Sequence, residues 1–401
     1  MEEIELSFMP RTQDTFHLLR GLLDEFEKKA RIHVKLREVL WSRSELIHFA
    51  IYQQGSDVSE VGVTWVDDLV AMNALRPYTF LDQTMIGKPE DFLSSSWQAG
   101  RLPDDEHLWA IPWLVEPYVI HYRKDLLRQA GVDEATAFQT HGQIAQTVES
   151  LKQSGIQIPL AAPVLTASPR RDPFCILQAL CSWVWGRGKD FCTPDGKRVL
   201  LNEPGILAAM HDYFLLFRSI SKDSVPDLME KGSIQLFRQG QAAITFGTMT
   251  MLAPWNELPV EMQENWGVVA FPKAGFVGGT HLVVWEYTRH PKEAVELVRF
   301  LTSPPSLLYL AKPLCTLPPR LSVLSAPDFR GDPLWDGVIR AAENGRSSPS
   351  IKLWGLIEEK LLNILHQIAE DLIRDPYLDA DTVIYMRIEP FAKKLSLTLS
   401  Q

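Results

Sequence analysis

Tryptophans and polar side chains at the ends of expected strands are the residues best suited to chemistry in this sequence. The short apolar run from Val58 to Val63 ends in Thr64 and Trp65, and a helical pattern follows directly. Ligand sites of α/β sheets open at the carboxyl ends of strands, so this turn delivers a hydroxyl and an indole to such a site. An indole joins a rigid apolar face to a polar edge, which suits stacking on a sugar ring.

A second group of candidates lies in the segment 108–122 and just after the first two expected strands. Trp113 and Glu116 lie between two β runs in the segment 108–122. A carboxylate can accept hydrogen bonds from two ligand hydroxyls, and an indole can stack on a ring face. Arg11 and Trp41 follow the first two expected strands, so we expect them to point towards the same crevice.

Several candidates have two interpretations each. Thr64 caps the following helix or binds ligand. Asp68 lies in the first turn of that helix, where it stabilises the helix dipole or accepts bonds from sugar hydroxyls. Gly278 and Gly279 allow either a close backbone approach or a plain tight turn. Trp183 ends a helix and faces either the ligand or the core, and core filling is the alternative for each of the twelve tryptophans.

The sequence lacks the common motifs of catalysis and of metal binding. The chain has no G-x-S-x-G, no P-loop, no H-E-x-x-H and no G-x-G-x-x-G after a strand. Asp104 and Asp105 lie on a polar loop and resemble solvated residues rather than a glycosidase pair. We therefore expect no catalytic residues, no cofactor and no metal site.

The four cysteines give no metal-binding pattern either. Cys175, Cys181, Cys192 and Cys315 form no C-x-x-C pair. We expect buried free thiols, with a bridge between Cys181 and Cys192 as the alternative in an oxidising compartment.

Composition narrows the class of protein and of partner. A length of 401 residues suggests two or three domains, and 46% hydrophobic with 22% charged residues describes an ordinary folded protein. The net charge of 40 − 50 = −10 argues against nucleic acid or an anionic membrane as main partner. No run of 18 apolar residues exists, so no transmembrane helix is expected.

Hydrophobic periodicity predicts the elements that position these residues. Apolar residues alternate along 4–8 and 32–36, recur at helical spacing along 15–30, and are followed by a helix at 44–54 and a strand at 58–63. This order of strand, helix, strand, helix, strand predicts a parallel sheet with right-handed crossovers.

Capping signals mark several later helices. Gly131 is suited to end a helix in the left-handed conformation. Thr140 and Gln143 fit a capping box. Pro173 and Pro204 are each suited to the first position of a helix.

Seven short segments, in order, resemble the bacterial extracellular solute-binding proteins, the sugar-binding receptors of ABC importers. They share a strand-to-helix turn, an "iPw…lyYnkdl" crossing, an "F..GkaA" helix end, a "GG" return, an "eA..fl.fl" helix, a "lP.r" turn and a tryptophan before a long C-terminal helix. In the same order, the matching segments of this chain are 59–78, 108–127, 234–247, 266–284, 291–301, 315–320 and Trp354.

The resemblance implies a fold of two α/β lobes, each a central sheet flanked by helices, of the periplasmic-binding-protein type. The first lobe is expected at 1–113 plus 266–314 and the second at 118–262 plus 318–401, with hinges near 113–118, 262–266 and 314–318.

The same resemblance implies the function. A mono- or oligosaccharide is expected to bind between lobes that close on it by hinge motion. Trp255 lies where the family often brings an aromatic residue to the ligand. The expected partners are ABC permease subunits, and the receptor is expected to be a monomer without catalytic activity.

The expected compartment is periplasmic or extracellular, although Met1-Glu2-Glu3 has no basic start or apolar stretch after it. Either a leader precedes this sequence in the native protein or the chain is a cytosolic ligand sensor of the same fold. A glycan-processing enzyme is the remaining, weaker alternative.

Overall fold

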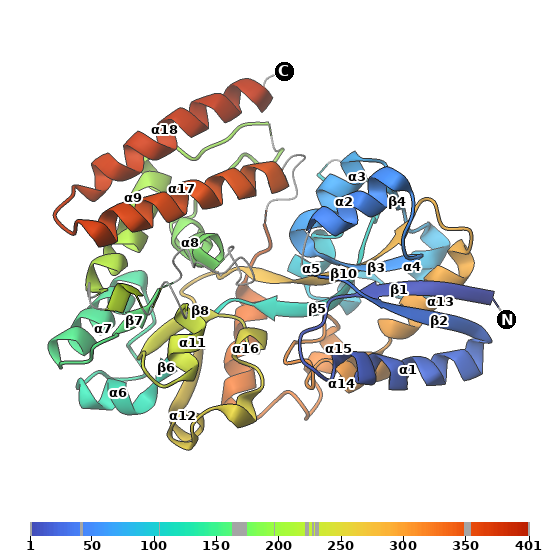
Figure 1. Ribbon diagram of the computed structural model, residues 1–401, viewed down its shortest axis with the longest axis horizontal. Helices are drawn as coiled ribbons and strands as arrows, with labels where there is room; N and C mark the ends of the chain where they lie inside the picture. Colours follow the sequence, from blue (N-terminus) through green and yellow to red (C-terminus); the bar gives the residue numbers. More distant parts are fainter. Residues whose placement is uncertain are drawn as a thin grey trace. The chain divides into compact units, whose positions relative to one another are not determined.

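The computed structural model describes residues 2–40, 43–103, 105–162, 175–195, 197–220, 224–226, 228, 232–348 and 354–399 (Figure 1). The chain divides into two compact units. Unit 1 comprises Met1–Glu116, Val277–Gly331 and Ser350–Gly355, and unit 2 comprises Pro117–Phe276, Asp332–Pro349 and Leu356–Gln401.

Unit 1 is built on a six-stranded sheet with the order β2-β1-β3-β10-β4, and β5 also pairs with β10. β1 pairs in parallel with β2 and β3, which confirms the parallel start predicted from the sequence. β10 runs antiparallel to β3 and β4. The strands are β1 Glu2–Phe8, β2 Ile32–Glu38, β3 Val58–Gly62, β4 Leu75–Arg76, β5 Ile111–Pro117 and β10 Val277–Trp285.

Burial explains why these segments form these elements. Ile4, Leu6 and Phe8 of β1 are at most 1% exposed, whereas Glu3 and Glu5 are more exposed and Ser7 is buried as well. All five residues of β3 are buried, as expected of a strand covered on both faces. The helices of unit 1 are α1 Thr15–Ala30, α2 Arg43–Tyr52, α3 Val66–Ala71, α4 Phe80–Ile86, α5 Ser94–Gln98, α13 Pro291–Leu301, α14 Pro304–Leu310 and α15 Leu321–Leu324.

Unit 2 has a four-stranded sheet with the order β7-β8-β6-β9. Its strands are β6 Val119–Arg123, β7 Leu160–Ala161, β8 Ile244–Gly247 and β9 Trp266–Ala270. Its described helices include α6 Lys124–Gln129, α7 His141–Gln153, α8 Cys175–Gly186, α9 Pro204–Leu215, α11 Ser233–Arg238, α12 Val260–Asn265, α16 Pro333–Asn344, α17 Trp354–Arg374, which starts in unit 1, and α18 Ala380–Leu399.

Two of the predicted helix ends are confirmed, one is present in part, and one lies outside the described residues. Gly131 has a φ of 66° after α6. The Thr140 hydroxyl accepts from the Gln143 N–H at 3.1 Å, whereas the Gln143 side chain accepts from that hydroxyl and does not complete a reciprocal box. Pro204 is the first residue of α9. The start predicted at Pro173 falls outside the described residues.

Two features differ from the sequence-based expectation. β9, placed by sequence in the first lobe, pairs with β6 of unit 2, where Gly267 leaves room for the Tyr122 ring. The C-terminal helix has a second helix beside it, since α17 and α18 run side by side (Figure 1), joined by Arg387 Nε to Asp371 at 2.9 Å.

Candidate ligand-binding site

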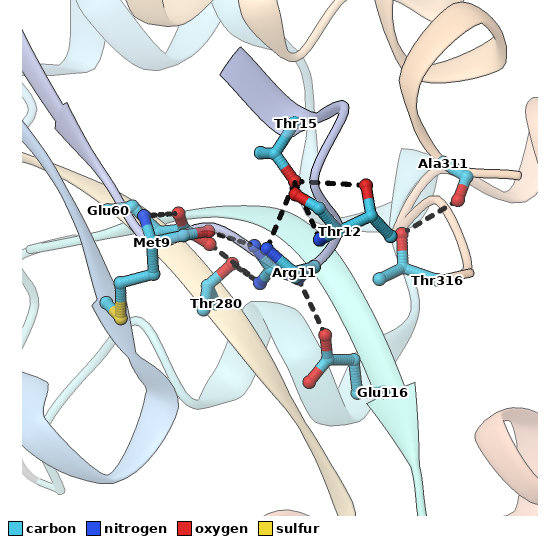
Figure 2. Close-up of polar contacts among 9 residues, drawn as sticks. All are labelled: Met9, Arg11, Thr12, Thr15, Glu60, Glu116, Thr280, Ala311 and Thr316. Atoms are coloured by element: carbon cyan, nitrogen blue, oxygen red, sulfur yellow. Dashed lines mark hydrogen bonds and ion pairs between the residues drawn. The ribbon is translucent and has the colours of Figure 1, made fainter. Parts of the chain in front are cut away.

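Arg11, between β1 and α1, holds two carboxylates of unit 1 together (Figure 2). Its Nε donates to Glu116 Oε1 at 2.7 Å, and its Nη2 lies 2.7 Å from Glu60 Oε1. Nη2 also donates to Thr280 Oγ1 at 3.1 Å. One guanidinium therefore links the β1 loop to β3, β5 and β10.

The loop that carries Arg11 is itself held by hydrogen bonds. The Arg11 and Thr12 N–H groups both donate to Thr15 Oγ1, at 3.1 and 2.9 Å, and that hydroxyl donates to the Thr12 carbonyl at 2.9 Å. This pattern closes a turn just before α1 (Figure 2). The turn therefore holds the backbone of Arg11 in place.

Burial makes the electrostatics of this cluster strong. The side chain of Arg11 is 5% exposed, that of Glu60 is 0% exposed and that of Glu116 is 13% exposed. Burial disfavours the charged guanidinium, but the charges of Glu60 and then Glu116 outweigh it and raise the pKa of Arg11. Both carboxylates lie 2.7 Å from the guanidinium, and the formal charges of the three side chains are one positive and two negative.

Glu116 is the member of this cluster that can meet a ligand. It lies near the end of β5 and retains solvent exposure, whereas Glu60 and Arg11 are nearly covered. A carboxylate held by an arginine is pre-oriented, and it accepts hydrogen bonds from hydroxyl donors. The arrangement is therefore suited to binding a polyhydroxylated molecule.

Trp65 and Trp113 are placed inside unit 1. Trp65 is 3% exposed and belongs to a core cluster with Leu46 and Phe49. Trp113 is 1% exposed within β5. These contacts give both indoles a packing role, and their predicted stacking on ligand stays a prediction.

The two predicted tryptophans of unit 2 differ in exposure. Trp183 is 2% exposed and packs among His141, Tyr213 and Phe246. Trp255 is half-buried, and its Nε1 donates to the Met249 carbonyl at 3.3 Å. Of the predicted tryptophans that the structure describes, Trp255 thus retains surface for stacking.

Of the polar candidates after β3, Asp68 forms a local ion pair. Thr64 lies in the short 3₁₀ helix Val63–Trp65 and is half-buried. Asp68 Oδ2 lies 3.1 Å from Arg43 Nη1, and burial raises the pKa of Asp68 while Arg43 lowers it. Trp41 lies outside the described residues.

The glycine pair shows a close backbone approach on one of its two members. Gly279 has a φ of 124°, and a Cβ there would lie 2.2 Å from the Leu114 carbonyl oxygen. The crowding arises because β5 pairs with β10 and brings its backbone close to Gly279. Gly278 is half-buried, and its predicted ligand contact stays a prediction.

Sequence reasoning missed Glu60 and Thr280. A usable signal existed for Glu60, because it is a charged residue in the fully buried strand β3. Such a residue needs a partner, and Arg11 was the available cation near a strand end. Thr280 follows the glycine pair and gave no distinctive signal.

Other chemistries find little support in the described part of the chain. No group of three or more His, Cys, Asp or Glu residues there could hold a metal ion. Cys181 and Cys192 are free thiols, and burial is the largest cause that raises the pKa of Cys192 and of Cys315 to about 12. No described helix is long and apolar enough to cross a membrane.

Comparison with solved structures defines the class of fold. The sugar-binding protein MalE from Xanthomonas citri superposes with a TM-score of 0.80 at 19% identity, over 100% of this chain and 99% of that chain. Maltose-bound MalE3 from T. maritima gives 0.79 at 18% identity, over 98% and 100%. A substrate-binding protein from Listeria monocytogenes in complex with cycloalternan gives 0.78 at 15% identity, over 98% and 99%. The chain thus has the two-lobed α/β fold of periplasmic binding proteins.

Comparison with protein families then identifies the family of this chain. It belongs to the bacterial extracellular solute-binding protein family, whose model matches residues 11–306. A probable ABC transporter-binding protein from Deinococcus radiodurans is 23% identical over 201 residues, which are 49% of this chain. The match spans 47% of that relative, about half of its length.

Proposed function

We propose that this chain is the carbohydrate-binding component of an ABC importer. The observation that carries the proposal is Glu116, a partly exposed carboxylate held in place by Arg11 near the end of β5. Its family binds solutes, and proteins of the same fold are named as binders of maltose and cycloalternan. In unit 2, the half-buried indole of Trp255 supplies an aromatic face for a sugar ring.

The proposal includes further roles that are typical of this class. The chain works outside the cytoplasm as a monomer, delivers its solute to permease subunits and catalyses no reaction. Enclosure of the ligand by both lobes, with Thr64, Asp68 and Gly278 among the contacts, is part of this proposal.

A thermal-shift screen of the full chain tests the proposal. The neutral probes are glucose, galactose, maltose, maltotetraose and cycloalternan, and the anionic probes are glucuronate and galacturonate. A bound probe at about 100-fold over its Kd adds roughly 2.7 kcal/mol to the free energy of unfolding.

The matched variant is Glu116→Gln, which keeps the shape of the side chain and removes its charge. Its affinity for the stabilising probe should fall on the order of tenfold, because a hydrogen bond to a charged group is lost. An unchanged melting temperature with every probe would contradict carbohydrate binding.

A further inference from the structure

We propose that Arg11 is a positioning residue and that Glu60 converts the cluster into a filter against anionic ligands. Arg11 holds Glu116 ready for ligand hydroxyls without contacting ligand itself. Glu60 changes the sum of the formal charges of the cluster from zero to one negative. This inference rests on the proposed function, because it concerns the ligand of the same site.

The first step is that each of the three guanidinium nitrogens of Arg11 has a partner within unit 1. The guanidinium has five N–H donors in a planar fork. Nε contacts Glu116, Nη2 contacts Glu60 and Thr280, and Nη1 donates to the Met9 carbonyl at 3.3 Å. With 5% of the side chain exposed, Arg11 has little surface to offer a ligand carboxylate or phosphate.

The second step is that Glu60 cannot turn away from Arg11. Its Oε2 accepts from the Met9 N–H at 2.7 Å, and its side chain is 0% exposed. An arginine at a strand end would otherwise be a ready partner for an anion. Glu60, inside the sheet, is the anionic partner that Arg11 already has.

The third step is the sum of the charges. Arg11 contributes one positive charge, and Glu60 and Glu116 contribute two negative charges, so the cluster carries one net negative charge. A ligand carboxylate brought to Glu116 meets a like charge in a partly desolvated place, where Coulomb repulsion is stronger than in water. A neutral hydroxyl meets an acceptor. The ligand class is therefore the neutral sugar rather than the uronic acid.

Two variants separate positioning from charge. Glu60→Gln should keep the hydrogen bond from Arg11 to Glu116 and bring the net charge of the cluster to zero. The double variant Arg11→Met with Glu60→Gln leaves the net charge at one negative, but removes the link to Glu116. Arg20→Lys is the control, because Arg20 in α1 also contacts two carboxylates, Asp24 at 2.9 Å and Glu27, neither of which belongs to this cluster.

Calorimetry with matched pairs of probes gives the readout. The pairs are glucose with glucuronate, galactose with galacturonate, and maltotetraose with its C6-oxidised form. Wild type should bind the neutral member of a pair at least tenfold more tightly, and Glu60→Gln should reduce that preference on the order of tenfold. The double variant should lose about tenfold in neutral affinity, while Arg20→Lys binds like wild type.

Each outcome bears on a distinct claim. Anionic probes that bind wild type as tightly as neutral ones would overturn the filter, and this comparison needs no variant to fold. A folded double variant, verified by circular dichroism, that binds neutral sugar like wild type would overturn the positioning role. Failure of every probe to bind wild type would instead overturn the proposed function, and this inference with it.

Discussion

At the scale of the residue, exposure separates the candidate ligand contacts from the core. Trp65 lies just after β3 and Trp113 lies within β5, and both are at most 3% exposed. Glu116 and Trp255 retain solvent contact. Sequence position therefore predicts that a side chain is near a site, but the packing around it decides which side chain reaches a ligand.

Two tryptophan variants test this division. Trp65→Ala should lower the free energy of unfolding by about 3–5 kcal/mol, because it empties space in the core cluster. Trp255→Ala should cost about 1–2 kcal/mol, because it loses contacts with the Trp266 and Trp335 rings, and should weaken carbohydrate affinity about tenfold. Denaturant unfolding and calorimetry measure the two effects. Equal losses of stability in both variants would contradict the division.

At the scale of the element, β5 and β10 approach each other through a glycine. Gly279→Ala places a methyl group against the Leu114 carbonyl at a φ of 124°. We expect a loss of about 2–3 kcal/mol of unfolding free energy from steric overlap and backbone strain.

Gly142→Ala is the matched control for that prediction. It lies in α7, and the nearest atom to an added Cβ is Thr140 Oγ1 at 3.9 Å. This variant should gain up to about 1 kcal/mol, because alanine favours the helix. Urea unfolding of both variants decides, and a Gly279→Ala protein as stable as wild type would refute the close approach.

The sheet of unit 2 contains a histidine that makes the fold acid-sensitive. His121 is buried in β6, where its Nε2 pairs with the Gly247 carbonyl at 3.2 Å and its Nδ1 accepts from Trp266 Nε1 at 3.3 Å. This pattern requires the neutral ring. Burial lowers the pKa of His121 to about 3, although the backbone bonds to Gly247 and Thr248 oppose the shift.

The pH dependence follows from the difference between folded and unfolded histidine. Below the unfolded pKa of about 6.5 the unfolded chain takes up a proton that folded His121 refuses, so unfolding becomes easier. The contribution is fully present above pH ~6.5 and falls by roughly 1 kcal/mol per pH unit towards pH ~3. His121→Gln should flatten the profile of unfolding free energy against pH. A profile parallel to that of wild type would contradict a buried neutral ring.

At the scale of the whole molecule, local patterns were predictable and distant pairings were not. The alternation in β1 and β2 and the apolar face of α1 follow from periodicity, so the parallel start of the first sheet was predicted. β10 returns to β3 after more than 200 residues, and periodicity carries no information about that pairing.

The candidate site shows the same limit. Arg11 was predicted from its place at a strand end, and Glu116 from its place beside the expected crossing between the lobes. Their contact, between residues 105 apart in sequence, and the role of Glu60 required the folded chain. A buried charge indicates that a partner exists, but only the topology of the sheet identifies it.

Carbohydrate binding is the central claim, and calorimetric titration of the full chain with maltotetraose and the other neutral sugars tests it most directly. The account predicts saturable binding of at least one neutral sugar, weakened about tenfold in Glu116→Gln and unaffected in Arg20→Lys. Binding of no neutral sugar, or equal affinity in wild type and Glu116→Gln, would contradict it.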